Sequence, residues 1–237
     1  MITEEAKSQV TAILEAKGLN VSYGQSRVLF DVDVVFPANE VSVIAGRNGA
    51  GKTTLLRTIA GFLRPVSGSV LLAGGNIVGL PPFRIVRLGV KYIPQDKQVF
   101  SDLTVRENLE LGSYAMKDWD WEKVFKYFPK LKELLNRKGA HLSGGERQML
   151  MIGRALLGKT RLLLLDEPME GLAPVVVQNL VETLRQLRED ISLVLVEQNL
   201  QVVRELADRV YLMKEGRIVA EITARQEIDN LTFEKEL

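Results

Sequence analysis

Short, almost continuous apolar runs recur along the chain and predict the strands of an α/β fold. Residues 41–45, 162–165 and 191–196 are runs of this kind, and they suit a parallel sheet that is buried on both faces. Between the last two runs, apolar side chains repeat at helical spacing over residues 177–187, and Pro174 stands in the first helical turn. This strand-helix-strand alternation predicts a mostly parallel sheet.

Paired strand-like segments predict antiparallel β-structure near both ends of the chain. Residues 13–21 and 28–36 are rich in β-branched and apolar side chains, flank a tyrosine-glycine turn, and predict an antiparallel region before the first parallel strand. The first of these segments is interrupted by Gly18, where we expect a break. Residues 210–213 and 217–220 flank a lysine-glutamate-glycine turn and predict a closing hairpin.

Residues 96–158 carry helical cues and no convincing strand. They separate a short strand expected at residues 90–93 from the strand at 162–165, so the pattern predicts helices between these two strands. Trp119 and Trp121 lie in this part of the chain, and we assign both to core packing, with contact to a partner as the alternative. Helical spacing is found at residues 105–111, 121–128, 131–135 and 148–157.

The segment GRNGAGKT at residues 46–53, here called the phosphate loop, stands between the strand at 41–45 and a helical run at 54–63. Its glycines let backbone N–H groups close around phosphate oxygens, Lys52 reaches the β and γ phosphates, and the Thr53 hydroxyl is the expected Mg²⁺ ligand at the positive end of the helix. The strand-loop-helix context argues against a chance glycine-rich turn. We therefore expect a nucleoside triphosphate to bind at Gly46, Arg47, Asn48, Gly49, Ala50, Gly51, Lys52, Thr53 and Thr54.

Two adjacent acidic residues follow the apolar run in LLLLDEP at residues 162–168. Asp166 ends the predicted strand, where its carboxylate can hold Mg²⁺ directly or through a water molecule. Glu167 points elsewhere and is positioned to orient or deprotonate an attacking water. An ordinary acidic turn after a strand is the alternative, and the phosphate loop in the same chain argues against it.

The segment LSGGERQ at residues 142–148, here called the signature segment, is predicted to open a helix with Ser143, Gly144 and Gly145. A hydroxyl group and several backbone N–H groups then converge with the helix dipole on an anion. Glu146 stands three residues after Ser143, so the same segment also forms a capping box. The two roles can coexist.

Together these three segments resemble the ATP-binding subunit of ABC transporters, over nearly the whole chain from residue 23 to about residue 220. The strings VEQN (196–199) and GLAP (171–174) resemble the smaller ATPase of branched-chain amino acid importers. The resemblance implies a single ABC ATPase domain over residues 1–237. Its expected fold is α/β, with a P-loop NTPase core, an antiparallel β region near the N-terminus and a helical subdomain inserted at about residues 96–158.

The resemblance also implies roles for further residues. Tyr23 matches the aromatic residue that stacks on adenine, with an ordinary core or edge-strand tyrosine as the alternative. Gln95, in the string YIPQ, matches the glutamine that senses the γ-phosphate through Mg²⁺ and water, so it is expected at the catalytic and metal site. The signature segment is expected to complete the ATP site of the opposing subunit.

The chain departs from the family pattern at two places. Gln198 stands where the family usually has a histidine; glutamine can donate and accept hydrogen bonds and can still bridge the γ-phosphate and the backbone of Glu167, but it does not carry a proton near neutral pH. Branched-chain importer ATPases share this residue, so we retain Gln198 as a catalytic candidate. Met169 and Glu170 replace a small polar residue and a leucine in the loop expected to act across the dimer, which leaves the coupling of two ATP sites open.

Composition limits the other kinds of site. The 237 residues include 31 basic and 30 acidic side chains, and a net charge of +1 gives no case for a nucleic-acid partner. Zero cysteines exclude disulfides and cysteine-ligated metal sites, and His141, the single histidine, is assigned a surface or packing role. Residues 1–10 lack the apolar core of a signal peptide, and no apolar run reaches the roughly twenty residues that span a bilayer.

The resemblance implies an ATP-hydrolysing subunit that uses ATP and Mg²⁺ and pairs head to tail with an identical or homologous ATPase subunit. It would act peripherally at the cytoplasmic face of the membrane, with transmembrane permease subunits and, indirectly, a solute-binding protein, in the import of branched-chain or related amino acids. Another importer, a lipid exporter and a soluble ABC ATPase are the alternatives. A non-enzymatic scaffold would lack Lys52 or Glu167, and both are present.

Overall fold

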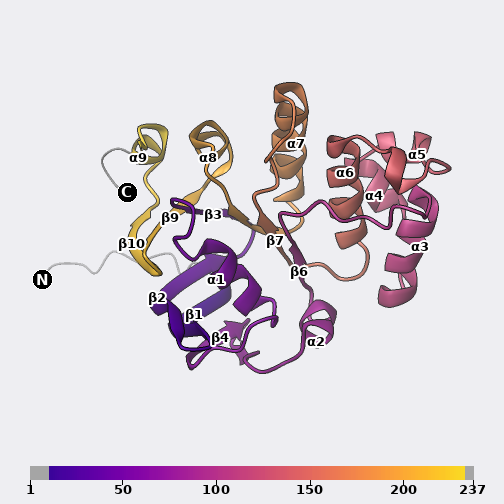
Figure 1. Ribbon diagram of the computed structural model, residues 1–237. Coiled ribbons are helices and arrows are strands. Elements are labelled where there is room, and N and C mark those ends of the chain that lie inside the picture. Colours follow the sequence, from indigo (N-terminus) through magenta and orange to yellow (C-terminus); the bar gives the residue numbers. More distant parts are fainter. Residues whose placement is uncertain (1–10, 233–237) are drawn as a thin grey trace, which may run out of the picture.

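The computed structural model describes residues 11–232 and has an α/β fold with two sheets (Figure 1). Within these residues, the larger sheet has six strands in the order β10-β9-β3-β8-β7-β6, and its neighbouring strands are parallel except for the β10-β9 pair. The predicted mostly parallel sheet and closing hairpin are therefore confirmed. The strands are β3 (Val41–Ala45), β6 (Val90–Ile93), β7 (Leu162–Asp166), β8 (Ser192–Val196), β9 (Arg209–Lys214) and β10 (Arg217–Ile222).

The central strands of this sheet are buried on both faces because their side chains alternate between two cores. Leu163 and Leu165 of β7 pack in a core with α7 and α8, whereas Leu162 and Leu164 pack in a second core with α1 and the smaller sheet. Figure 1 shows α7, α8 and α9 on one side of the large sheet and α1 on the other. The helices outside the β6–β7 connection are α1 (Lys52–Ile59), α2 (Pro82–Arg87), α7 (Pro174–Leu187), α8 (Leu200–Leu206) and α9 (Arg225–Asp229).

The smaller sheet is antiparallel, as predicted, and has the strand order β2-β1-β4-β5. Its first strand does not break at Gly18, so that expectation is wrong. Gly18 has a φ of 57° and lies where the β1–β2 register shifts between Ala16 and Leu19, so a β-bulge keeps the strand continuous. The strands are β1 (Ala12–Tyr23), β2 (Ser26–Pro37), β4 (Ser67–Leu72) and β5 (Gly75–Asn76).

The connection between β6 and β7 is helical, as predicted for residues 96–158, and its helices form a group beside the sheets in Figure 1. The predicted capping box opens α6: Ser143 Oγ accepts the Glu146 N–H at 3.2 Å, and Glu146 Oε2 accepts the Ser143 N–H at 2.8 Å. The elements are α3 (Val105–Met116), α4 (Glu122–Tyr127), α5 (Lys130–Glu133), the 3₁₀ helix Gly139–His141 and α6 (Gly144–Ala155). No helix within residues 11–232 is both long enough and apolar enough to cross a membrane.

The two tryptophans have different environments. Trp121 packs against the core and donates its indole N–H to Ser113 Oγ at 2.8 Å, so core packing is confirmed there. Trp119 is 53% exposed and meets only the edge-to-face ring of Tyr114, itself 71% exposed, among the aromatic contacts of the described residues. The core-packing assignment is wrong for Trp119, which is more than half exposed in the loop between α3 and α4.

The fold constrains the adjacent residues Gly144 and Gly145 to different extents. A Cβ on Gly145 would lie 2.6 Å from Cγ1 of Val176 in α7, so only glycine allows α6 and α7 to approach this closely. A Cβ on Gly144 would meet Leu172 at 3.7 Å, which is an ordinary van der Waals distance. The packing of the chain therefore requires glycine at the second position and not at the first.

We expect Gly145→Ala to lower the free energy of unfolding by about 1–3 kcal/mol, because the added methyl group overpacks the α6–α7 contact. Gly144→Ala is the matched control and should not lower it, because its methyl group would meet Leu172 only at an ordinary van der Waals distance. Urea denaturation of both variants and the parent measures the difference. Equal stability of the two variants would contradict this account of the helix contact.

Candidate active site

The loops that follow β3, β7 and β8 meet at one edge of the large sheet. These strands are parallel neighbours, so their carboxyl ends lie side by side. A cavity of about 340 Å³ at this edge is lined by the phosphate loop together with Gln95 and Glu167. A neighbouring cavity of about 400 Å³ also includes Asn48, Gln95 and Glu167, and adds Gln198. Four segments that are far apart in sequence thus share one hollow.

The side chain of Lys52 is buried at the start of α1, within the phosphate loop. Its Nζ donates to the carbonyl oxygens of Gly46 at 2.8 Å and Arg47 at 3.0 Å. Burial lowers the pKa of Lys52, while the nearby carboxylates of Glu167 and Asp166 act in the opposite direction. The cation is held over the loop by neutral carbonyl groups, which phosphate oxygens can replace.

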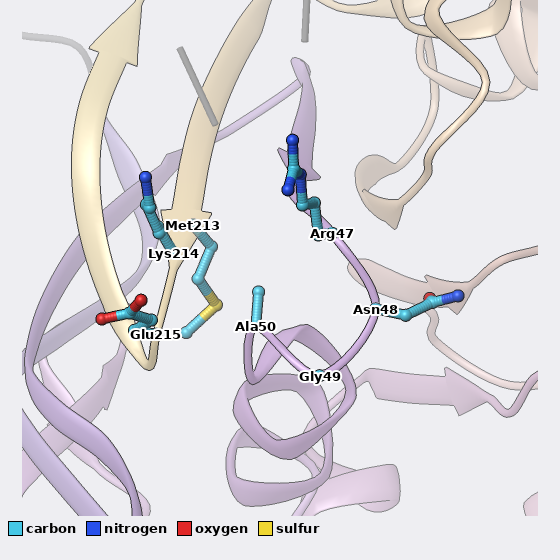
Figure 2. Close-up of a pocket in the computed structure, with 7 residues that line it drawn as sticks. All are labelled: Arg47, Asn48, Gly49, Ala50, Met213, Lys214 and Glu215. Atoms are coloured by element: carbon cyan, nitrogen blue, oxygen red, sulfur yellow. The ribbon is translucent and has the colours of Figure 1, made fainter. Parts of the chain in front are cut away.

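The hairpin β9–β10 packs directly against the phosphate loop. Figure 2 shows a hollow between the two, with the side chain of Asn48 pointing away from the hairpin. A Cβ on Gly46 would lie 2.3 Å from the carbonyl oxygen of Met213, and Gly216 donates its N–H to the Ala50 carbonyl at 2.9 Å. Glycine at position 46 is therefore required by the close approach of β9, in addition to any contact with phosphate.

Asp166 is 1% exposed and uses both carboxylate oxygens. Oδ1 accepts a hydrogen bond from Thr53 Oγ1 at 3.1 Å, and Oδ2 accepts one from Tyr92 Oη at 3.0 Å. Burial raises the pKa of Asp166, and these two hydrogen bonds act in the opposite direction. The two residues predicted as metal ligands, Thr53 and Asp166, are therefore adjacent, and their oxygen atoms are the donor type that Mg²⁺ prefers.

Glu167 contacts a different set of residues from Asp166. It has a φ of 46°, in the left-handed region, and its N–H donates to the carbonyl oxygen of Val196 at 3.0 Å. Its Oε1 accepts a hydrogen bond from Gln198 Nε2 at 2.5 Å, and the same Nε2 donates to Asn48 Oδ1 at 2.8 Å. The Gln198 amide thus links the phosphate loop to the carboxylate of Glu167, and not to the Glu167 backbone as expected from the sequence.

Gln95 lines both cavities and is held by the loop that follows Glu167. Its Nε2 donates to Glu170 Oε2 at 2.7 Å, and Lys97 donates to the Glu170 carbonyl oxygen. Because a carboxylate only accepts, Glu170 binds the nitrogen end of the Gln95 amide and leaves Oε1 for a cation. Met169 is buried in the core. At the two positions where the chain departs from the family pattern, Met169 is therefore a core residue and Glu170 orients Gln95.

Two predicted parts of the site are not brought to this hollow. Within residues 11–232, the residues that line the two cavities include neither Tyr23 nor the signature segment. Tyr23 is 44% exposed at the end of β1, and Ser143 is exposed at the start of α6. The chain alone assembles the phosphate loop with Asp166, Glu167, Gln95 and Gln198, and it leaves Tyr23 and, within the signature segment, Ser143 exposed.

Sequence reasoning missed two residues of this site. Tyr92 binds Asp166, and its position in YIPQ, three residues before Gln95, is the signal that could have identified it. Glu197 is 5% exposed and accepts the backbone N–H groups of Gln198 and Asn199. Glu197 is the second residue of VEQN. A carboxylate directly after a buried strand was the available signal.

A family model described as "ABC transporter" matches residues 29–170. The chain belongs to the ABC transporter ATPase family. It is 44% identical to the high-affinity branched-chain amino acid transport ATP-binding protein BraG of Pseudomonas aeruginosa, over 88% of this chain and 91% of the relative. It is 40% identical to the probable branched-chain amino acid transport ATP-binding protein LivF of Archaeoglobus fulgidus, over 94% of this chain and 97% of the relative.

A crystal structure of a nucleotide-free ATP-binding cassette from an ABC transporter superimposes with a TM-score of 0.84 at 29% identity, covering 92% of this chain and 94% of that one. The predicted fold class and the predicted ATPase activity are thereby confirmed. This ABC ATPase binds ATP and hydrolyses it to ADP and phosphate. The role of each residue described above stays a prediction.

We expect Gln198→Ala to slow ATP turnover roughly 10- to 100-fold, the effect of losing one transition-state hydrogen bond of about 1.5–3 kcal/mol. Gln198→His should stay active because imidazole can make the same contact, and it should gain a pH dependence near pH 6–7 that the glutamine contact cannot show. Turnover and ATP affinity from about pH 5.5 to 8.5 for all three proteins check this. An alanine variant as fast as the parent would reduce Gln198 to a strand-end residue.

Proposed function

We propose that this ABC ATPase energises the import of branched-chain or related amino acids through a membrane permease. The observation that carries the hydrolytic part is the hydrogen bond from Gln198 to Glu167 at 2.5 Å, beside the phosphate loop and in one cavity with Gln95. The substrate class is supported by BraG and LivF, both named as branched-chain amino acid transport proteins and both aligned over most of this chain.

In this proposal the phosphate loop binds the triphosphate. Lys52 exchanges its two carbonyl acceptors, Gly46 and Arg47, for oxygens of the β and γ phosphates, which offer it a charged partner in a buried place. Glu167 accepts the proton of the attacking water. Gln198 transfers one of its two amide hydrogen bonds from Asn48 to the γ-phosphate and keeps Glu167 oriented with the other.

The residues present fit Mg²⁺. Thr53 Oγ1 and Asp166 Oδ1 are 3.1 Å apart, and Glu170 leaves the Gln95 amide oxygen free, so hydroxyl, carboxylate and amide oxygens are available. When bound, the ion supplies charge neutralisation for the β and γ phosphate oxygens. Thr53 and Asp166 would hold it, with Gln95 joining them from the β6 side.

We further propose that the site is completed by a second, identical or homologous ATPase subunit in a head-to-tail dimer. The signature segment supports this because Ser143 is exposed and a Cβ on Gly144 would meet its nearest neighbour only at 3.7 Å. The helix N-terminus there presents backbone N–H groups to an anion. Tyr23, exposed at the end of β1, would stack on adenine.

The proposed place of action is the cytoplasmic face of the membrane, where transmembrane permease subunits provide the path and a solute-binding protein delivers the amino acid. ATP binding drives the two ATPase subunits together, and hydrolysis lets them separate. Exposed residues of the helical connection, such as Tyr114 and Trp119, are available for contact with another chain. BraG and LivF, both named as transport ATP-binding proteins, support the link to transport.

Lys52→Ala is expected to abolish ATP hydrolysis and weaken ATP binding, because it removes the side-chain cation that is buried within the phosphate loop. Turnover and ATP affinity of purified protein, and leucine uptake by cells that carry the variant in place of the parent, measure the effect. Lys130→Ala, on the exposed side of α5, is the control and should match the parent in every assay.

The two parts of the proposal fail separately. Parental turnover in Lys52→Ala would contradict the role of the phosphate loop. If Lys52→Ala loses turnover while uptake of leucine, isoleucine and valine is unchanged, the role assigned to the phosphate loop stands. That result would contradict the assignment to branched-chain amino acid import.

A further inference from the structure

Glu197 is a buried carboxylate in the lining of the catalytic cavity, and the proposed mechanism of hydrolysis does not use it. It directly follows β8, is 5% exposed, and lines the same cavity as Glu167 and Gln198. A carboxylate is rarely buried to this extent without hydrogen bonds or an ion pair, because removing its charge from water is energetically unfavourable. Its hydrogen bonds therefore indicate what it does.

One oxygen of Glu197 holds the backbone that follows it. Oε1 accepts the N–H groups of Gln198 at 2.8 Å and Asn199 at 2.9 Å, so two successive backbone groups converge on one atom. The N–H of Glu197 itself donates to the carbonyl oxygen of Ile44 in β3 at 3.3 Å. The direction in which the chain leaves β8 is therefore set by this residue.

The backbone direction at Gln198 decides where its amide can reach. Nε2 must lie 2.5 Å from Glu167 Oε1 and 2.8 Å from Asn48 Oδ1, and these two acceptors belong to two other loops. A glutamine side chain has several rotamers. When the N–H groups of Gln198 and Asn199 are both held, the backbone is fixed, and fewer rotamers of Gln198 are compatible with contacts to Glu167 and Asn48. A rotated backbone would break both contacts together.

We propose that Glu197 is a positioning residue for ATP hydrolysis: by accepting the two N–H groups after β8, it aims the Gln198 amide at Glu167. The proposal rests on the role proposed for Gln198. For this role Glu197 needs a side chain long enough to accept the two N–H groups, and it does not need a negative charge. The second oxygen, Oε2, is buried and has no hydrogen-bond partner within residues 11–232.

The electrostatic surroundings agree with a role that does not need the charge. Burial raises the pKa of Glu197, with the two N–H bonds acting in the opposite direction, and the charged groups that face it are Glu167 and Lys52. A neutral amide oxygen can accept the same two N–H groups. Reach and charge can therefore be separated by substitution.

The test compares Glu197→Gln, which keeps the reach and loses the charge, with Glu197→Asp, which keeps the charge and is one methylene shorter. We expect kcat of the glutamine variant within about two-fold of the parent and kcat of the aspartate variant about ten-fold lower, because misplacement of about 1 Å can cost up to a hundred-fold. ATP affinity should stay unchanged in both. In the Gln198→Ala background, Glu197→Asp should add less than two-fold, since the side chain it aims is gone.

The control is Glu205→Asp, the same substitution on α8 at a carboxylate that bonds to Gln201 outside the cavity, and it should leave kcat unchanged. Three results would overturn the proposal: a slow Glu197→Gln variant with a fast Glu197→Asp variant, parental kcat in both, or full additivity of Glu197→Asp with Gln198→Ala. Parental kcat in Gln198→Ala alone would instead show that the role proposed for Gln198 is wrong.

Discussion

The register of three parallel strands is the constraint on which the catalytic site depends. Val196 of β8 lies opposite Ile44 of β3 on one side and Asp166 of β7 on the other. The backbone continues this register past the strands: Glu167 donates to the Val196 carbonyl, and Glu197 donates to the Ile44 carbonyl. The phosphate loop, the pair Asp166–Glu167 and Gln198 therefore follow strand ends that are aligned along one edge of the sheet. A slip of one residue would turn every side chain of a strand to the opposite face.

Burial of these strands on both faces gives the site its rigidity and also its chemistry. Lys52 and Asp166 lie at the edge of a dry core, so each loses solvation and each must find protein partners. Lys52 finds two carbonyl groups, and Asp166 finds the hydroxyls of Thr53 and Tyr92. Such contacts hold charged groups in place before the substrate binds, and they are weak enough for phosphate and a cation to replace.

Local patterns in the sequence were sufficient to predict the strands, the helical connection and the loops that meet at the site. The phosphate loop and the acidic pair carry their chemistry in contiguous residues, and the parallel direction of the central strands follows from the alternation of strands and helices. The short helices α2 and α8, of six and seven residues, were not predicted. Gly18 was misjudged because the same glycine can end a strand or form a bulge within it.

The contacts between loops could not be predicted, because they depend on which way single side chains point after the chain has folded. The contacts of Glu170 with Gln95 and of Gln198 with Asn48 join residues from different loops. The contact of Glu197 with the backbone N–H of Gln198 is local, but it depends on the direction of the Glu197 side chain. Trp119 and Trp121 stand two positions apart, and only one is packed. Residue type alone predicts burial for both.

The most direct test of the account is the turnover of Glu167→Gln, measured together with its ATP affinity. An amide keeps the size and a hydrogen bond to Gln198, but it cannot accept the proton of the attacking water. The account predicts that ATP affinity is retained while kcat falls by about 10²- to 10⁴-fold, the usual contribution of a general base. Turnover equal to that of the parent would show that Glu167 is not the base, and it would contradict the mechanism built on the meeting of these three strands.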